Sequence, residues 1–298
     1  MTNQSTSHLF MIEPESFYGN EQTASSNHYQ ENNITEDPRS IAKTALNEFH
    51  ALKKAIEDRG IKVTALKGSK DCPDHIFPNW FITFSDKTMQ IFSMMAPNRR
   101  LEKKTKMIEL LKKSYELTND MSYLEEEDIF LESTSSMVFD RTNRSVYAGI
   151  SPRTNENQLK KWCANNNFEL IMFETESHSG DAIYHTDVLM YVGTSIIGIC
   201  FDVIKPEYRE HVKEKVRRHH EVLELSSNQI LSFCGNAIEA KNKNNDLFLI
   251  MSTTAYNALN QNQLDVLLTH YHEIIHSDIP TIEKYGGGSA RCMLTELF

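Results

Sequence analysis

A thiol and an imidazole are the two side chains of this sequence whose chemistry combines most directly. Cys292 follows the triple glycine Gly286 to Gly288, and His185 lies much earlier in the chain. A thiolate attacks electrophilic carbon, and an imidazole accepts or donates the proton that such a reaction moves. Glycines let the backbone approach a ligand closely. Together these residues suit nucleophilic catalysis, with Cys292 as the nucleophile and His185 as its acid–base partner.

Further polar residues stand where other predicted hairpins begin. They are Glu132, Asp187, Asn236 after Gly235 and, within residues 71–79, Asp71, Asp74 and Asn79. Carboxylates hold a planar cation such as guanidinium through charge-assisted, bidentate hydrogen bonds. If separate units of the fold bring these side chains together, the resulting site suits a guanidino group.

The elements that must position these residues repeat along the chain. A hairpin, a helix and a strand follow one another in units of roughly 50 residues, the size of a supersecondary repeat. The predicted units are hairpin 76–95, helix 99–116 and strand 121–124; hairpin 129–150, helix 155–166 and strand 168–173; hairpin 187–204, a helix from 206 and strand 221–225; and hairpin 236–251, helix 254–268 and strand 272–276.

A helix at 40–59 and a strand at 61–66 make half of a further unit. We expect its hairpin to come from both ends of the chain, with residues 293–298 beside residues 9–12. This pairing would close the repeats into a ring and leave no sheet edge open. The predicted fold class is therefore α/β, a closed ring of pseudo-symmetric ββαβ repeats.

The repeats favour one domain, although the length alone would allow two. We predict a single domain over residues 8–298 and a flexible N-terminus over residues 1–7.

Composition excludes several classes of protein. The chain has 298 residues, a net charge of −10 and 40 % apolar residues, which is typical of a globular protein. The acidic charge argues against nucleic-acid binding. The longest apolar stretch, residues 188–204, is interrupted by glycine and polar residues and does not suit a membrane span.

The same survey sets expectations for location and partners. The N-terminus shows no secretory signal, and five widely spaced cysteines are typical of a reducing cytoplasm. We expect a cytoplasmic protein with a small-molecule amino-acid substrate, no nucleic acid, no membrane, no metal and no cofactor. Whether it forms a homo-oligomer stays open.

Eight short segments form a pattern that is specific when they are taken in order. They are Pro14, Phe17, Asn20 and Thr23; Asp71-Cys72-Pro73-Asp74 before Phe77-Pro78-Asn79-Trp80; Asn98-Arg99-Arg100-Leu101-Glu102; Leu131-Glu132; Ser151-Pro152-Arg153-Thr154; Tyr184-His185-Thr186-Asp187-Val188; Gly235-Asn236; and Ile282-Glu283 before the triple glycine and Arg291-Cys292-Met293. From about Met11 to Phe298 the chain resembles the guanidine-group-modifying, or pentein, superfamily of arginine deiminases and amidinotransferases. It is most similar to the citrulline-utilisation hydrolases within it.

The resemblance implies a five-bladed α/β propeller of ββαβ units and a hydrolase acting on a C–N bond of citrulline or arginine. Cys292 would attack the guanidino or ureido carbon and form a covalent thiouronium-type intermediate. His185 would protonate the departing nitrogen and then activate water. Substrate nitrogens would be held by Glu132 and Asp187.

The resemblance also implies the rest of the pocket. Asp71, Asp74 or Asn79 would complete its opposite side, and Arg100 or Arg153 would bind the amino-acid carboxylate. An amidinotransferase on the same fold is the alternative enzyme.

Two departures from the family pattern bear on the substrate. Ser133 and Ser135 stand where the family has glycines, and we expect their side chains to narrow the approach to Glu132. Asp187 favours a cationic, arginine-like group because an unpaired buried charge is costly, whereas Asn79 favours citrulline. The choice between the two substrates stays open.

Two further hypotheses belong to other classes. His272-Glu273-Ile274-Ile275-His276 matches the HExxH pattern of zinc hydrolases, which must lie on a helix for both imidazoles to reach one metal. The repeat predicts a strand there, which separates the two histidines by roughly 13 Å. The other hypothesis is a non-catalytic binding protein that kept the ring, motivated by Ser133 and Ser135.

Overall fold

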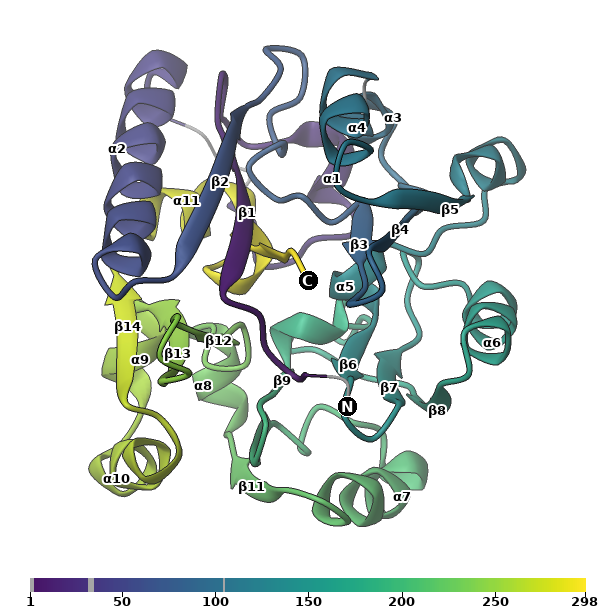
Figure 1. Cartoon of the computed structure of the whole chain (residues 1–298), viewed down its shortest axis with the longest axis vertical. Coiled ribbons are helices and arrows are strands. Elements are labelled where there is room, and N and C mark those ends of the chain that lie inside the picture. Colours follow the sequence, from purple (N-terminus) through teal and green to yellow (C-terminus); the bar gives the residue numbers. More distant parts are fainter. Residues whose placement is uncertain (1–2, 32–34, 104) are drawn as a thin grey trace.

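Five three-stranded sheets organise the part of the chain that the structure describes. The structure is a computed structural model and describes residues 3–31, 35–103 and 105–298. Figure 1 shows the sheets following one another around a common centre. The longer helices lie on the outside: α2 (Pro38–Glu57), α4 (Thr105–Leu111), α6 (Glu156–Asn165), α7 (Pro206–Arg217) and α10 (Gln261–His270).

Four of the sheets share one order of elements, as predicted. A hairpin supplies two antiparallel strands, and the strand after a helix joins the second of them in parallel. These sheets are β3 (Phe81–Thr83), β4 (Thr88–Ile91) and β5 (Glu116–Asp120); β6 (Val138–Asp140), β7 (Ser145–Gly149) and β8 (Glu169–Phe173); β9 (Met190–Val192), β10 (Ile196–Ile199) and β11 (Glu221–Glu224); and β12 (Ile238–Lys241), β13 (Leu247–Ser252) and β14 (Glu273–Ser277).

The remaining sheet joins the two ends of the chain. β1 (His8–Glu13) pairs in parallel with β2 (Lys62–Lys67) and antiparallel with β15 (Thr295–Glu296). Leu9 lies opposite Glu296, and Phe10 lies opposite Thr295. The predicted pairing of the C-terminal segment with residues 9–12 is therefore present, and it places residues just before β15 near the centre of Figure 1.

Helix α2 illustrates how the sequence fixes an element. Its buried residues recur at intervals of three and four: Ile41, Ala45, Glu48, Phe49, Leu52 and Ile56. The helix begins slightly before the predicted start because the Asp37 side chain accepts a hydrogen bond from the Ser40 backbone N–H and Pro38 fits the first turn. Gly60 adopts φ +78° after its end, a conformation that suits glycine.

Two predicted helices differ from the structure. The helix predicted over 99–116 is divided into α3 (Pro97–Arg100), a 3₁₀ turn η1 (Leu101–Lys103) and α4; Lys104 lies outside the described residues. The division follows from buried charge, because Glu102 turns inward to pair with Arg99. The strand predicted over residues 121–124 comes earlier in the sequence, as β5. Residues 121–124 lead instead into the 3₁₀ helix η2 (Ser122–Glu127).

The helix predicted over 254–268 is also two helices, α9 (Thr253–Ala258) and α10. Asn260 caps α10 in a capping box with Gln263, so a new helix begins there. The apolar spacing runs on across this point and therefore predicted one continuous helix.

Short helical segments that the repeat did not predict lie in the connecting loops. They are α1 (Glu21–Ala24), α5 (Ser133–Ser136), α8 (Ser227–Leu231), α11 (Pro280–Gly286), η3 (Thr186–Val188) and η4 (Arg291–Met293). Several of them carry candidate site residues. Within the described ranges, none of the helices combines the length and apolar character that a membrane crossing requires.

The N-terminal segment is packed from the point where the structure describes it, which corrects the flexible tail expected over residues 1–7. Gln4, Ser5 and Thr6 are buried. The Gln4 amide nitrogen donates to the backbone oxygens of Phe139 at 2.9 Å and Val192 at 3.1 Å. Met1 and Thr2 lie outside the described residues.

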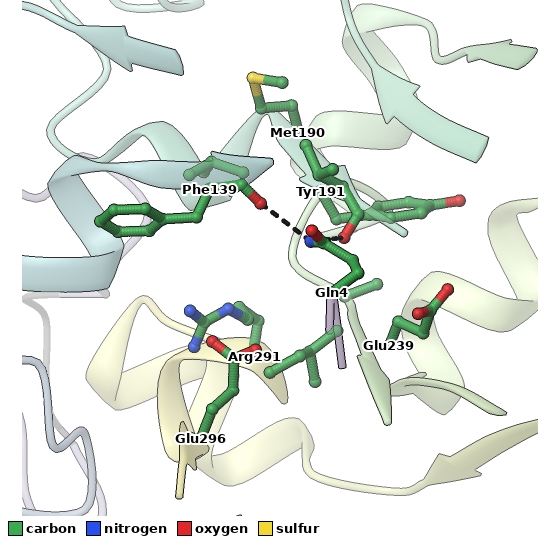
Figure 2. A pocket seen from close by; sticks show the side chains of 11 residues that line it. Gln4, Phe139, Met190, Tyr191, Glu239, Arg291 and Glu296 are labelled. Atoms are coloured by element: carbon green, nitrogen blue, oxygen red, sulfur yellow. Dashed lines mark hydrogen bonds between the residues drawn. The ribbon is translucent and has the colours of Figure 1, made fainter. Parts of the chain in front are cut away.

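Gln4 closes one side of a small pocket at the centre of the sheets, whose empty space is about 390 Å³ when open solvent is included. Figure 2 shows its amide between β6 and β9, with Arg291 and Glu296 across the cavity. Gln4 Oε1 accepts the backbone N–H of Arg141 at 2.8 Å. The segment is ordered because this one side chain satisfies backbone groups of two sheets that would otherwise be buried without partners.

Replacing Gln4 by alanine should lower the free energy of unfolding by about 2 kcal/mol, because it leaves two carbonyl oxygens and one N–H without their partner. Urea unfolding followed by circular dichroism measures the loss. The matched control is Asn3→Ala at the exposed neighbouring position, expected to change stability by less than about 0.5 kcal/mol. Equal stability of the two variants would mean that the segment is a loose tail after all.

Candidate active site

Cys292 and His185 line one pocket although they come from different sheets. Cys292 lies in η4, just before β15, and His185 lies directly before η3, which leads into β9. The pocket is small and partly open to solvent, and its empty space is about 240 Å³ when open solvent is included. Its other lining residues are Asn27, Phe77, Asn79, Arg99, Arg153, Tyr184, Gly286 and Gly288.

The Cys292 thiol is buried and held by two polar neighbours. The Asn236 side-chain nitrogen lies 3.1 Å from Sγ, and Sγ lies 3.5 Å from Asp187 Oδ2. Burial, followed by the Asp187 carboxylate, raises the pKa of the Cys292 thiol well above its usual range. The sulfur is therefore a protonated thiol at neutral pH until an opposite charge arrives beside it.

His185 is held through one ring nitrogen and leaves the other available. Nε2 lies 2.8 Å from Glu132 Oε2, and Nδ1 has no hydrogen-bond partner among the described residues. Burial lowers the pKa of His185, although Glu132 opposes this effect. A neutral imidazole that donates Nε2–H to a carboxylate has an unprotonated Nδ1, so Nδ1 is the atom that can accept a proton.

Glu132 orients His185, which corrects the expectation that it holds substrate nitrogens. Its Oε1 accepts the Met95 backbone N–H at 2.9 Å, and its Oε2 is occupied by His185. Burial alone would raise the pKa of Glu132, but Arg153, the hydrogen bond from His185, and Arg99 hold it well below its usual range. The guanidinium Nη1 atoms of Arg153 and Arg99 lie 3.7 and 3.9 Å from Oε2.

Asp187 lies beside the sulfur, and one of its two carboxylate oxygens has no hydrogen-bond donor among the described residues. Oδ2 accepts the Ser135 hydroxyl at 3.0 Å, whereas Oδ1 is buried and has no hydrogen-bond partner among the described residues. Burial raises the pKa of Asp187, and nearby His185 and Arg291 partly offset that rise. A buried acceptor without a donor favours a ligand that brings N–H groups and positive charge.

The two serines do not narrow the approach to Glu132, contrary to expectation. Ser133 directs its hydroxyl to the Phe81 carbonyl at 2.8 Å, and Ser135 directs its hydroxyl to Asp187. Ser133 adopts φ +46°, in the left-handed region where glycine has no steric penalty. A serine at position 133 therefore costs some backbone strain. In return, the two serine hydroxyls add hydrogen bonds that hold α5 and Asp187 in place.

The arginine that reaches the pocket is Arg99, where the sequence pointed to Arg100. Arg99 is buried and bonds Glu102 at 2.9 Å, whereas Arg100 is partly exposed and donates to the Met94 and Met95 carbonyl oxygens. Successive residues of a helix point in different directions, so only one of two adjacent arginines on α3 can face inward. Burial lowers the pKa of Arg99, but the carboxylates of Glu102, Glu132 and Asp74 outweigh burial and raise the pKa above its usual value, so Arg99 stays charged.

The other predicted arginine, Arg153, does line the pocket. Its Nη2 donates to the Ser26 hydroxyl at 2.8 Å, and its guanidinium lies 4.9 Å from the centre of the Tyr184 ring. This arrangement fixes its position without neutralising its charge.

The three candidate substrate-binding residues of segment 71–79 lie in different places in the structure, and only Asn79 lines the pocket. Asp74 is buried behind it, accepts the Asn20 amide at 2.7 Å, and has its pKa raised by burial. Asp71 is exposed and does not line the pocket, which corrects its assignment to substrate binding. The segment turns at residues 71–76, so its first carboxylate faces outward.

Several site residues were missed or undervalued in the sequence. The segment around α1 covers the pocket: Asn27 lines it and donates to the Gly286 carbonyl at 3.0 Å. This segment lies outside the repeat, so periodicity gave no signal for it. Asn236 stands at a predicted hairpin start and in one of the eight resembling segments, but no role was predicted for it, because spacing does not show its contact with the sulfur.

The HExxH segment lies on a strand, as predicted. Glu273 and His276 belong to β14, where Glu273 pairs with Arg59 at 2.5 Å and His276 contacts Thr253 at 3.0 Å. Within residues 3–31, 35–103 and 105–298, no cluster of three or more His, Cys, Asp or Glu side chains is arranged to hold a metal ion.

Together the groups at this pocket can carry out covalent catalysis on a cationic carbon centre. Sγ has the chemistry of a nucleophile, and His185 Nδ1 in the same pocket has that of a proton acceptor. Beside the sulfur, Asp187 Oδ1 is a buried acceptor for N–H groups. Arg99 and Arg153 supply positive charge on the other side of the imidazole.

Comparison with known protein structures shows the same fold elsewhere. The N-terminal domain of ArgZ, an arginine dihydrolase from the ornithine-ammonia cycle in cyanobacteria, was solved with its substrate; it matches with a TM-score of 0.77 and 15 % identity over 97 % of both chains. Unliganded AgrE matches with a TM-score of 0.76 and 15 % identity, over 98 % of this chain and 39 % of that chain. A dimethylarginine dimethylaminohydrolase adduct with S-methyl-L-thiocitrulline matches with a TM-score of 0.66 and 16 % identity over 100 % of both chains.

Sequence comparison assigns the family. No curated protein sequence matches the chain significantly. The profile of the family described as "N,N dimethylarginine dimethylhydrolase, eukaryotic" matches residues 13–298, almost the whole chain. The chain therefore belongs to this dimethylarginine dimethylhydrolase family, within the pentein superfamily of guanidino-group-modifying proteins.

Proposed function

We propose that this protein is a cysteine-dependent hydrolase that cleaves a C–N bond of arginine or an N-methylated arginine, releasing citrulline and an amine. The observation that carries the proposal is the placement of Cys292 and His185 at one pocket, with the Asp187 carboxylate 3.5 Å behind the sulfur. The family name and the arginine dihydrolase among the structural neighbours agree with a guanidino substrate.

The charge of the pocket favours a guanidinium over a ureido group. Asp187 Oδ1 is a buried acceptor without a donor, and a guanidinium offers it N–H groups together with positive charge. A positive charge next to Sγ also lowers the pKa of the Cys292 thiol, since an opposite charge favours the ionised form. Binding of the substrate would thus generate the nucleophile, and a neutral ureido group would not do so.

The first half of the reaction uses the neutral imidazole as a base. The thiol proton passes to His185 Nδ1 while Sγ bonds to the guanidino carbon. The imidazolium then gives this proton to the departing nitrogen, the C–N bond breaks, and the amine leaves. The Glu132 carboxylate stabilises the transient imidazolium through Nε2.

The second half uses the same groups in the reverse sense. Neutral His185 takes a proton from a water molecule, whose oxygen adds to the thiouronium carbon. The C–S bond breaks, the carbonyl of citrulline forms, and the thiolate takes the imidazolium proton. The proton of the former hydroxyl leaves with the amine, which is released as an ammonium ion. No net proton or electron remains on the protein.

The amino-acid carboxylate requires a cation at the same pocket. Arg99 and Arg153 line it, and among the described residues their Nη1 atoms have only the contacts with Glu132 Oε2, at 3.9 and 3.7 Å. We assign the carboxylate contact to this pair in place of Arg100.

The proposed function also needs the sheets to act as one rigid frame. We propose that they are the blades of a five-bladed α/β propeller forming one domain, closed by the pairing of β1 with β15. Supporting this, residues of the pocket come from loops of all parts of the chain, from Asn27 to Cys292.

Incubation with arginine, N-methylated arginines and citrulline, followed by mass spectrometry, tests the reaction. We expect citrulline and an amine from the arginine compounds and no product from Cys292→Ala, since the sulfur is the nucleophile. Ornithine from citrulline would identify a ureidase, and a new guanidino product with an added amine would identify an amidinotransferase. Activity that survives in Cys292→Ala but is lost on chelation would contradict the thiol mechanism.

Two alkylating agents of similar size test the charge argument. Chloroacetamidine is a planar cation and chloroacetamide is neutral. The ratio of their alkylation rates should be at least about tenfold larger on Cys292 than on the thiol of glutathione, because the bound cation lowers the pKa of Cys292. Asp187→Asn should bring the ratio back toward that of glutathione. A ratio in the native protein equal to that of glutathione would count against a guanidinium site.

A further inference from the structure

Two side chains of the described residues are seen to contact the Cys292 sulfur, Asn236 and Asp187, and Asn236 is the nearer of the two. Its Nδ2 lies 3.1 Å from Cys292 Sγ and also donates to the Asp187 backbone oxygen at 2.9 Å. Its Oδ1 accepts the Cys292 backbone N–H at 3.3 Å. One amide therefore spans the backbone of the nucleophile, its sulfur and the chain segment that carries Asp187.

The position of Asn236 is fixed by the backbone around it. The side chain is fully buried, and its backbone N–H donates to the Phe233 carbonyl at 2.9 Å. A Cβ on the preceding Gly235 would lie 2.4 Å from the Val188 carbonyl oxygen, so only glycine allows this loop to approach η3 so closely. The Gly235-Asn236 pair is thereby held between η3 and η4, the two segments that supply Asp187 and Cys292.

We propose that Asn236 is a catalytic residue of this site, whose amide N–H stabilises the Cys292 thiolate and holds the sulfur in line with the substrate carbon. This inference deepens the proposed function and rests on it. An amide that donates to a thiolate forms a charge-assisted hydrogen bond, which is stronger than its bond to a neutral thiol. The Asn236 amide therefore lowers the pKa of the Cys292 thiol, as the reaction requires, whereas burial raises it.

The other charged and titratable groups around Cys292 do not duplicate this role. Asp187, in η3, is a like charge that opposes ionisation of the thiol, and the Tyr184 phenol lies close by in the same pocket. Arg291, in η4, favours the thiolate, but its guanidinium donates to the Leu294 carbonyl and lines the central cavity (Figure 2). His185 is neutral and serves as the proton acceptor.

The test is the rate of Cys292 alkylation by iodoacetamide, followed by peptide mass spectrometry from pH 7 upward. Below its midpoint this rate follows the thiolate fraction, so losing the donor should slow it about tenfold to hundredfold at each pH. Two variants are compared with the native chain. Asn236→Asp keeps the shape and removes the N–H donor, and Asn236→Ala removes the amide altogether.

Asn242→Ala is the matched control. Asn242 is also a buried asparagine of the same sheet region, hydrogen-bonded within its turn to Asp246 at 2.9 Å, and it makes no contact with Cys292. Its alkylation rate should equal that of the native chain. Thermal unfolding establishes that each variant is folded.

The outcomes separate cleanly. Slower alkylation in folded Asn236→Ala supports the proposal, because this variant removes the donor without adding a charge. A native rate in either folded variant overturns it. Failure of both Asn236 variants to fold would also overturn it, because the residue would then serve stability. Alkylation needs no substrate, so a slowed rate in a protein that converts no guanidino compound would retain Asn236 as the thiolate donor and discard the proposed reaction.

Discussion

The hydrogen bond between Glu132 and His185 is the interaction on which the arrangement of the site depends. Burial would protonate an isolated carboxylate, but Arg99 and Arg153 keep Glu132 ionised, and an ionised carboxylate can only accept. It therefore fixes which imidazole nitrogen carries the hydrogen and leaves Nδ1 for chemistry. Because both Glu132 oxygens have partners, Asp187 is the carboxylate next to the sulfur that keeps an oxygen without a hydrogen-bond donor among the described residues.

Much of the fold could be predicted from the sequence because its signals are local. Apolar alternation and polar turns marked the hairpins, and the repeat implied that the chain ends pair, as β1 and β15 do. The prediction failed where tertiary contacts override local pattern. Glu102 turns inward to Arg99 and ends α3, and the Asn260 cap divides a helix whose apolar spacing continues across the break.

The sequence predicted two candidate reacting groups that the structure places at one pocket, and it predicted fewer of the residues around them. Residue type singled out Cys292 and His185, since few other side chains can perform their chemistry. The choice between adjacent Arg99 and Arg100 depends on which way α3 faces, and that is decided by packing against distant segments. The contact of Asn236 with the sulfur depends on the approach of two loops that lie far apart in the sequence.

The pairing of β1 with β15 has a consequence for how the protein is made. Cys292 lies immediately before β15, and the amide that holds its sulfur comes from an earlier hairpin. While a ribosome is still adding residues, the sheets already synthesised lack the strand that joins the two chain ends. The nucleophile can take its place only when β15 has left the exit tunnel and reached β1.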